Sequence, residues 1–108
     1  MAYLTKHASA RMSQRCGIQK KSQAKVLRRV IRHGVTHSEA SAKQNLCKWV
    51  DGLYLSHRNP TKILLYGNGA YLFKGDTLLT VIKIPEELQA SVNALRVIKG
   101  SKLNRREY

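Results

Sequence analysis

Three side chains near the N-terminus, His7, Arg11 and Arg15, repeat every four residues. Residues with this spacing rise along one face of an α-helix, drifting by roughly 40° per step. RNA cleavage without a metal needs a base for the 2′-hydroxyl proton, cations for the charge that builds on phosphate, and an acid for the departing 5′-oxygen. His7, Arg11, Arg15 and the neighbouring Lys6 can supply all three roles. The same spacing also fits a histidine bonded to backbone beside two surface arginines.

Positive charges greatly outnumber negative charges in this chain. Its 108 residues include 20 Lys and Arg against 6 Asp and Glu, a formal net charge of +14, and no acidic residue occurs before Glu39. Such a block repels itself unless a polyanion lies nearby, whereas surfaces chosen for solubility mix both signs. We therefore expect nucleic acid to bind this stretch. The candidate binding residues are Lys6, Lys20, Lys21, Lys25, Arg28, Arg29 and Arg32.

Length and composition indicate one folded domain. The chain is short for two domains, and 43% apolar residues are enough for a core. It has no run of about 18 apolar residues and no secretory signal, so we expect a cytoplasmic protein that does not bind membranes. Cys16 and Cys47 belong to no C-x-x-C pair, which predicts two reduced thiols.

The first third of the chain predicts a helical hairpin. Thr5 can cap a helix that ends near Cys16, with Gly17 in the left-handed position after it. Ser22 can cap a second helix that stops at Gly34. This second helix carries an apolar stripe opposite a basic face, and the stripe consists of Val26, Leu27, Val30 and Ile31.

The middle of the chain allows two interpretations. Thr36 and Glu39 fit a capping box, and an apolar stripe follows, so we expect a third helix over residues 39–55. The alternative is a β-hairpin, because Asp51-Gly52 is a strong turn signal and a glycine inside a helix costs about 1 kcal/mol relative to alanine. The continuous apolar stripe favours the helix.

In the later part of the chain, the pattern of apolar residues changes to the two-residue period of β-strands. Segments 63–66, 70–74 and 77–84, separated by glycine-containing turns, predict a three-stranded antiparallel meander. A closing helix follows Pro85 and stops at Lys99-Gly100. We therefore predict an α+β fold: an N-terminal helical hairpin packed on a small antiparallel meander, with an additional middle helix and a C-terminal helix. Residues 1–100 form the single domain, and residues 101–108 a flexible basic tail.

Residues 5–18 carry a resemblance to a known family. They read TKHASARMSQRCGI and precede a basic helix and Gly34. This run resembles the H-x-x-x-R-M-x-x-R-G-I opening of small RelE-like domains, within the wider group of barnase, colicin ribonuclease and RelE-type folds. Residues 66–84 are similar to the strands that close such domains. One residue departs from the pattern, because Cys16 stands between Arg15 and Gly17. An insertion at a helix end would re-aim Arg15.

The resemblance implies a metal-independent endoribonuclease similar to the toxins of toxin–antitoxin pairs. It would cut RNA, free or on the ribosome, and need no cofactor. RNA or an acidic antitoxin would neutralise its excess positive charge. His7, Arg11 and Arg15 would be catalytic, together with Thr80, which resembles a polar position on the last strand.

A second function class stays open. A non-catalytic adaptor encoded by a phage or mobile element could keep the basic hairpin only to bind nucleic acid or a nucleoprotein. A zinc site at His33 and His37 is rejected, because Gly34 ends the helix between them and no third ligand lies nearby. Cys47 as a nucleophile lacks an identifiable base.

Overall fold

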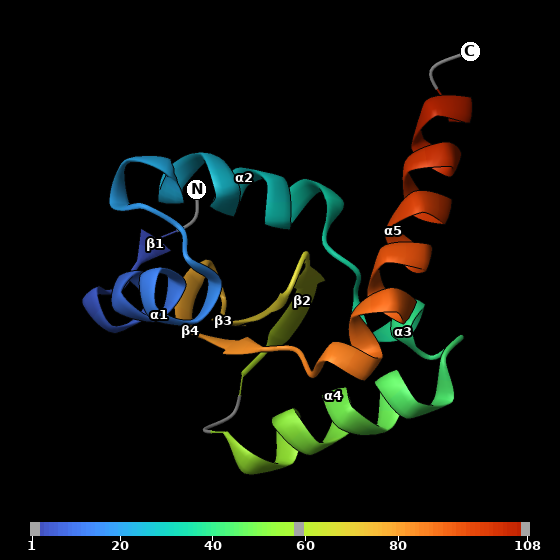
Figure 1. Ribbon diagram of the computed structural model, residues 1–108, viewed down its shortest axis with the longest axis horizontal. Helices are drawn as coiled ribbons and strands as arrows, with labels where there is room; N and C mark the ends of the chain where they lie inside the picture. Colours follow the sequence, from blue (N-terminus) through green and yellow to red (C-terminus); the bar gives the residue numbers. More distant parts are fainter. Residues whose placement is uncertain (1–2, 58–59, 107–108) are drawn as a thin grey trace.

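A four-stranded sheet lies at the centre of the molecule, between layers of helices (Figure 1). The computed structural model describes residues 3–57 and 60–106, with side chains for residues 4–57 and 60–99. The strands are β1 (Tyr3–Leu4), β2 (Lys62–Tyr66), β3 (Gly69–Lys74) and β4 (Thr77–Lys83), in the order β1-β4-β3-β2. The predicted antiparallel meander is confirmed as β2, β3 and β4. The short β1, which pairs parallel to β4, was not predicted.

The two N-terminal helices follow their local capping signals. Helix α1 (Lys6–Cys16) begins where Thr5 Oγ1 accepts a hydrogen bond from the Ala8 amide at 3.0 Å, and it ends at Gly17, whose φ of 65° lies in the left-handed region. Helix α2 (Gln23–His33) follows a short 3₁₀ helix, η1 (Lys20–Ser22), and ends at Gly34 as predicted. The predicted Ser22 cap is wrong in one respect: Ser22 precedes α2, but its side chain makes no capping bond, because the 3₁₀ turn leads directly into the helix.

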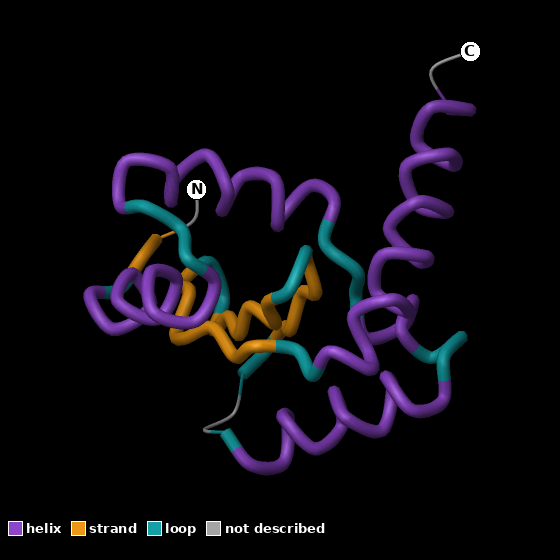
Figure 2. The backbone as a smooth tube through the Cα atoms, in the orientation of Figure 1, coloured by secondary structure: helices purple, strands orange, loops and turns teal. Residues whose placement is uncertain are grey.

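The middle segment is helical, but it forms two helices instead of the single one expected over 39–55. Helix α3 (His37–Ala40) carries the predicted capping box, and α4 (Gln44–Ser56) follows after a break (Figure 2). At the break Ser41 Oγ donates to the Ser38 carbonyl at 2.5 Å, and the backbone turns to i→i+3 bonds. A serine hydroxyl that competes for a backbone carbonyl disfavours a continuous helix.

The β-hairpin alternative at Asp51-Gly52 is wrong, because both residues lie inside α4. Burial of the apolar stripe outweighs the helix cost of the glycine, since three residues of α4 are buried. These residues are Leu46, Val50 and Leu53.

Helix α5 (Glu86–Arg106) is longer than predicted. It passes through Gly100, so the predicted stop at Lys99-Gly100 is wrong, and residues 101–106 of the supposed flexible tail are helical. A single glycine costs only about 1 kcal/mol in a helix, and no proline follows to end it. Figure 1 shows the last turns of α5 extending away from the other layers. Residues 107–108 of the tail lie outside the described residues.

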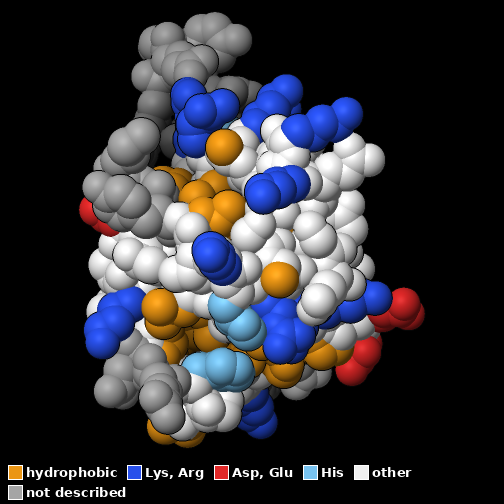
Figure 3. Space-filling view, turned by 90° about the vertical axis from the view of Figure 1, so that its left-hand side faces the viewer, with side chains coloured by type: hydrophobic (Ala, Val, Ile, Leu, Met, Phe, Trp, Pro, Cys, Tyr) orange, Lys and Arg blue, Asp and Glu red, His pale blue; other side chains and the backbone are white. Residues whose placement is uncertain are grey.

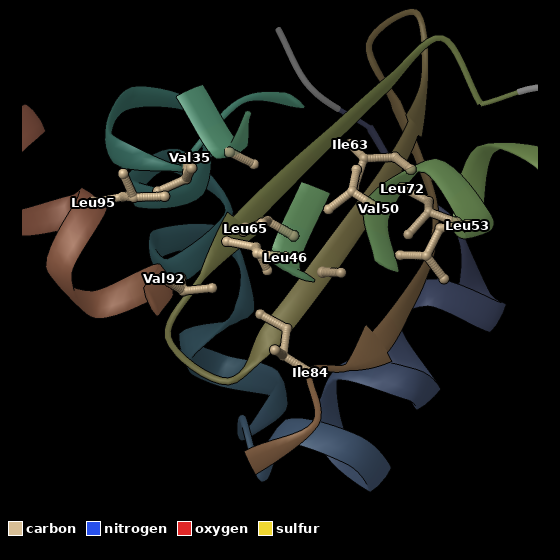
Figure 4. Close-up of a cluster of buried hydrophobic side chains, with 12 residues drawn as sticks. Val35, Leu46, Val50, Leu53, Ile63, Leu65, Leu72, Ile84, Val92 and Leu95 are labelled. Atoms are coloured by element: carbon tan, nitrogen blue, oxygen red, sulfur yellow. The ribbon is translucent and has the colours of Figure 1, made fainter. Parts of the chain in front are cut away.

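Both faces of the sheet are covered. Helices α1 and α2 pack on one face and α3, α4 and α5 on the other, so that neighbouring residues of β2 and β3 point into different cores. The α1/α2 core contains Ala8, Met12, Leu27, Val30, Leu64, Tyr71, Phe73, Leu78 and Val81. The core of the other face, drawn in Figure 4, contains Val35, Ala40, Leu46, Val50, Leu53, Ile63, Leu65, Ala70, Leu72, Ile84, Val92 and Leu95.

Among the described residues, no helix combines the length and the apolar character needed to cross a membrane.

Candidate active site

The start of α1 lies against β4, and this contact brings His7 to Thr80. His7 Nε2 is 3.2 Å from Thr80 Oγ1, although the two residues are 73 positions apart in the sequence. Thr5, the residue that caps α1, also donates from its Oγ1 to the Leu78 carbonyl at 3.2 Å. The cap therefore fixes the first turn of α1 both to its own helix and to the neighbouring strand.

A β-bulge in the sheet helps to place Thr80. Leu72 pairs with Thr80 and Phe73 pairs with Leu78, so Leu79 has no partner in the ladder. Bulges re-aim side chains and occur often beside active sites. Here the irregularity lies next to the hydroxyl that meets His7.

The hydrogen bonds of His7 indicate which ring nitrogen carries the proton. Nε2 is approached by Thr80 Oγ1 and, at 3.5 Å, by Arg11 Nε, which can only donate. Nε2 is therefore the acceptor and Nδ1 carries the proton of the neutral ring. Arg11 is held from its other side by Gln14, whose Oε1 accepts from Nη1 at 3.2 Å. An unprotonated ring nitrogen beside a guanidinium group suits proton abstraction near an anion, once a substrate hydroxyl takes the place of the present donors.

A second histidine, which the sequence did not single out, lines the same pocket. The pocket has a volume of about 330 Å³ and lies between α1, β4 and the end of α4. Its lining residues are His7, His57, Pro60, Leu72, Leu79 and Thr80, and none of these described residues is acidic. His57 follows the last residue of α4, where periodicity predicts only a loop, so its place in this pocket depends on tertiary packing.

The neighbours of His57 indicate which of its ring nitrogens carries a proton. Nδ1 lies 3.2 Å from the Leu53 carbonyl and 3.2 Å from Ser56 Oγ, and the Ser56 hydroxyl proton already bonds to the Gly52 carbonyl at 2.7 Å. Nδ1 must therefore donate, which leaves Nε2 as the nitrogen available to a ligand. Each histidine of the pocket thus holds its Nδ1 proton and has Nε2 for proton transfer.

Arg15 makes different contacts from His7 and Arg11, which precede it on the same helix. Its Nη1 donates to the Val81 carbonyl at 2.9 Å, and the side chain is only partly exposed. The guanidinium group therefore ties the end of α1 to β4. The neighbouring Cys16 packs beside Gly69, where an added Cβ would lie only 2.9 Å from its Sγ. Burial raises the pKa of the Cys16 thiol.

The predicted RNA-binding residues form a separate surface. All of them are exposed on α1, η1 or α2, and none lines the histidine pocket. Lys6 and Lys20 line a separate groove of about 570 Å³ between α1 and α2. Figure 3 shows histidine side chains on the same face of the molecule as Lys and Arg side chains.

A buried glutamine holds the two basic helices together. Gln23 is 1% exposed, accepts from Ser9 Oγ at 2.5 Å and donates to the Ser9 carbonyl at 3.0 Å and to Ser13 Oγ at 3.1 Å. A buried amide with its hydrogen bonds satisfied sets one packing of α2 on α1. This contact determines where the basic face of α2 lies relative to His7.

No protein-family model matches this chain, and neither the curated proteins nor the solved structures contain a significant match. A functional conclusion must therefore come from the chemistry of the site.

Proposed function

We propose that this protein is a metal-independent endoribonuclease with His7 at the centre of its active site. The observation that carries the proposal is the geometry of His7: its Nε2 is 3.2 Å from Thr80 Oγ1, in a pocket that a second histidine also lines. A base and an acid on two sides of one phosphate are what metal-free RNA cleavage requires. The resemblance of residues 5–18 to RelE-like domains supports the same activity.

In the proposed reaction His7 Nε2 takes the proton of the ribose 2′-hydroxyl. The 2′-oxygen attacks phosphorus, the bond to the 5′-oxygen breaks, and protonated His57 gives its Nε2 proton to the leaving oxygen. The products are a 2′,3′-cyclic phosphate and a 5′-hydroxyl. Arg11, next to His7, stabilises the negative charge that grows on the phosphate in the transition state.

The basic surface of α1, η1 and α2 would hold the RNA backbone. Phosphate contacts made by lysine and arginine position a nucleic acid without reading its sequence. The proposed partners are therefore RNA, free or on the ribosome, and an acidic antitoxin that covers the same surface. The proposed compartment is the cytoplasm.

The decisive experiment uses purified protein and a mixed-sequence RNA, with EDTA present. We expect cleavage to leave 2′,3′-cyclic phosphate ends, and His7→Ala to lose about 10²–10⁴-fold in rate. His33→Ala is the matched control, because His33 lies at the end of α2 outside the pocket. If wild-type protein leaves free and ribosome-bound RNA intact, the nuclease proposal is wrong.

One observation favours the adaptor as a second candidate. The exposed basic residues of α2 do not line the pocket, so the surface could bind nucleic acid without any reaction there. An adaptor would bind RNA without cutting it, and its biological effect would survive both His7→Ala and Arg11→Ala.

A further inference from the structure

Three side chains with metal-ligand chemistry meet at the corner between α3 and α4. His37 Nε2 lies 2.5 Å from Asp51 Oδ1, and Cys47 Sγ lies 3.9 Å from Asp51 Oδ2. The ligand atoms of all three residues lie within 4.8 Å of one another. His33, whose pairing with His37 the sequence analysis rejected, is not part of this cluster.

Local structure explains why the three groups converge. The capping box of Thr36 and Glu39 makes His37 the first residue of α3. Cys47 and Asp51 are four residues apart in α4, so their side chains lie on one face of that helix. The ring of Tyr54 lies 5.2 Å from the His37 imidazole and packs beside it. The cluster is therefore set by a cap, a helix repeat and an aromatic contact.

A surface ion pair alone does not account for this arrangement. The side chains of His37 and Asp51 are 43% and 52% exposed, and exposed pairs contribute only about 0–1 kcal/mol. The Cys47 thiol lies on the same side and donates to Asp51 Oδ2 at 3.9 Å. A pocket of about 400 Å³, lined by His37, Asp51, Tyr54 and Leu55, leaves open space beside the pair.

One distance in the cluster is close to the separation of zinc ligands, and the other is shorter. Zinc bonds of about 2.0–2.3 Å in tetrahedral geometry place ligand atoms about 3.3–3.8 Å apart. The 3.9 Å from Cys47 Sγ to Asp51 Oδ2 is close to that range, whereas the 2.5 Å from His37 Nε2 to Asp51 Oδ1 must widen by about 1 Å through side-chain rotation before both groups can bind one ion. Thiolate and imidazole ligands select zinc over magnesium or calcium.

We propose that His37, Cys47 and Asp51 bind one zinc ion, with water as the fourth ligand. The site shares no lining residue with the histidine pocket, so the ion takes no part in the proposed RNA cleavage. Its effect is structural: it links α3 to α4 across the break at residues 41–43. An ion that binds only the folded chain raises the unfolding temperature.

The test is a titration of untagged, reduced protein with Co²⁺, followed by displacement with Zn²⁺. We expect one equivalent to bind, with a thiolate-to-cobalt charge-transfer band in the near ultraviolet that Zn²⁺ removes. Cys47→Ser should abolish the band. His37→Ala and Asp51→Asn should each weaken Zn²⁺ affinity more than about 100-fold, which exceeds the loss of about 10–100-fold expected when a residue that only hydrogen-bonds to a ligand is removed. Cys16→Ser and His33→Ala are the matched controls and should bind as wild type does.

Thermal unfolding provides a second readout. Zn²⁺ should raise the midpoint of wild type and both controls, but not of the three ligand variants. Circular dichroism checks that each variant is folded. If Cys47→Ser does not fold, the His37 and Asp51 variants test whether the cluster binds zinc. Absence of metal binding by wild type, or a thiolate band that survives in Cys47→Ser, overturns the proposal. No RNA is used, so this outcome is independent of the ribonuclease test.

Discussion

Two histidine sites of this molecule differ in the charge of their neighbours. In the pocket, His7 faces a hydroxyl and a guanidinium group, and no described lining residue is acidic. At the α3–α4 corner, His37 faces the carboxylate of Asp51 and the thiol of Cys47. A histidine beside cations suits an anionic ligand such as phosphate, whereas a histidine beside a carboxylate and a thiol suits a metal cation. The neighbours, and not the histidine itself, determine which ligand fits.

The largest expected effect concerns His57, whose proposed role rests on its place in the folded chain. His57→Ala should lower the rate of RNA cleavage about 10²–10⁴-fold, because it removes the proton donor for the leaving oxygen. RNA binding and Co²⁺ binding should be unchanged. The pH profile of cleavage should change from bell-shaped to one-sided, since one of the two proton-transfer groups is gone. A variant with a wild-type rate and profile would remove His57 from the mechanism.

Arg11 and Arg15 form a matched pair on the same helix. Arg11→Ala should lower the cleavage rate about 10²–10³-fold, because its charge acts on the transition state. Arg15→Ala should leave the rate nearly unchanged and lower the free energy of unfolding by about 1–3 kcal/mol, since the Val81 carbonyl loses its donor. Single-turnover kinetics and urea denaturation measure the two effects. An equal rate loss in both variants would show that the bond from Arg15 to β4 opens when RNA binds.

These two residues also show how far the sequence predicts the site. The i, i+4 spacing correctly places His7 and Arg11 next to each other, because that contact depends on helix geometry alone. It predicts the same role for Arg15, whose bond to Val81 depends on the approach of β4. His57 lies beyond any local pattern, because it reaches the pocket only through the packing of α4 on the other face of the sheet.

The elements of the fold differ in the same respect, because some depend on local sequence and others on long-range contacts. Caps and turns with a local cause, such as Thr5 and Gly17, are where the sequence predicts them. The two-residue β1 has too little sequence for a periodic pattern, and its pairing with β4 is a long-range contact. The break at Ser41 and the helix through Gly100 depend on small differences of about 1 kcal/mol, which residue patterns do not resolve.

The two thiols provide a smaller test of the metal cluster. Cys47 should react with a thiol reagent at neutral pH more than about tenfold faster than Cys16. Burial raises the pKa of the Cys16 thiol, so less reactive thiolate is present below that pKa, and the reaction of Cys16 should accelerate as pH rises. Zn²⁺ should protect Cys47 and leave Cys16 unaffected. Mass spectrometry of timed samples measures both rates, and in denatured protein the two thiols should react alike.

The smallest expected effect separates the basic surface from the rest of the charged exterior. If Lys25 and Arg29 contact phosphates, removing either one should make the slope of log affinity for RNA against log salt shallower by roughly one unit. Lys48→Ala is the matched control, because Lys48 is equally exposed but lies on α4, next to Cys47. Its removal should leave the slope unchanged. Filter binding of the His7→Ala protein at several salt concentrations measures affinity without cleavage. Equal changes for Lys25, Arg29 and Lys48 would mean that RNA responds only to net charge, and the assignment of the α2 face as the binding surface would be wrong.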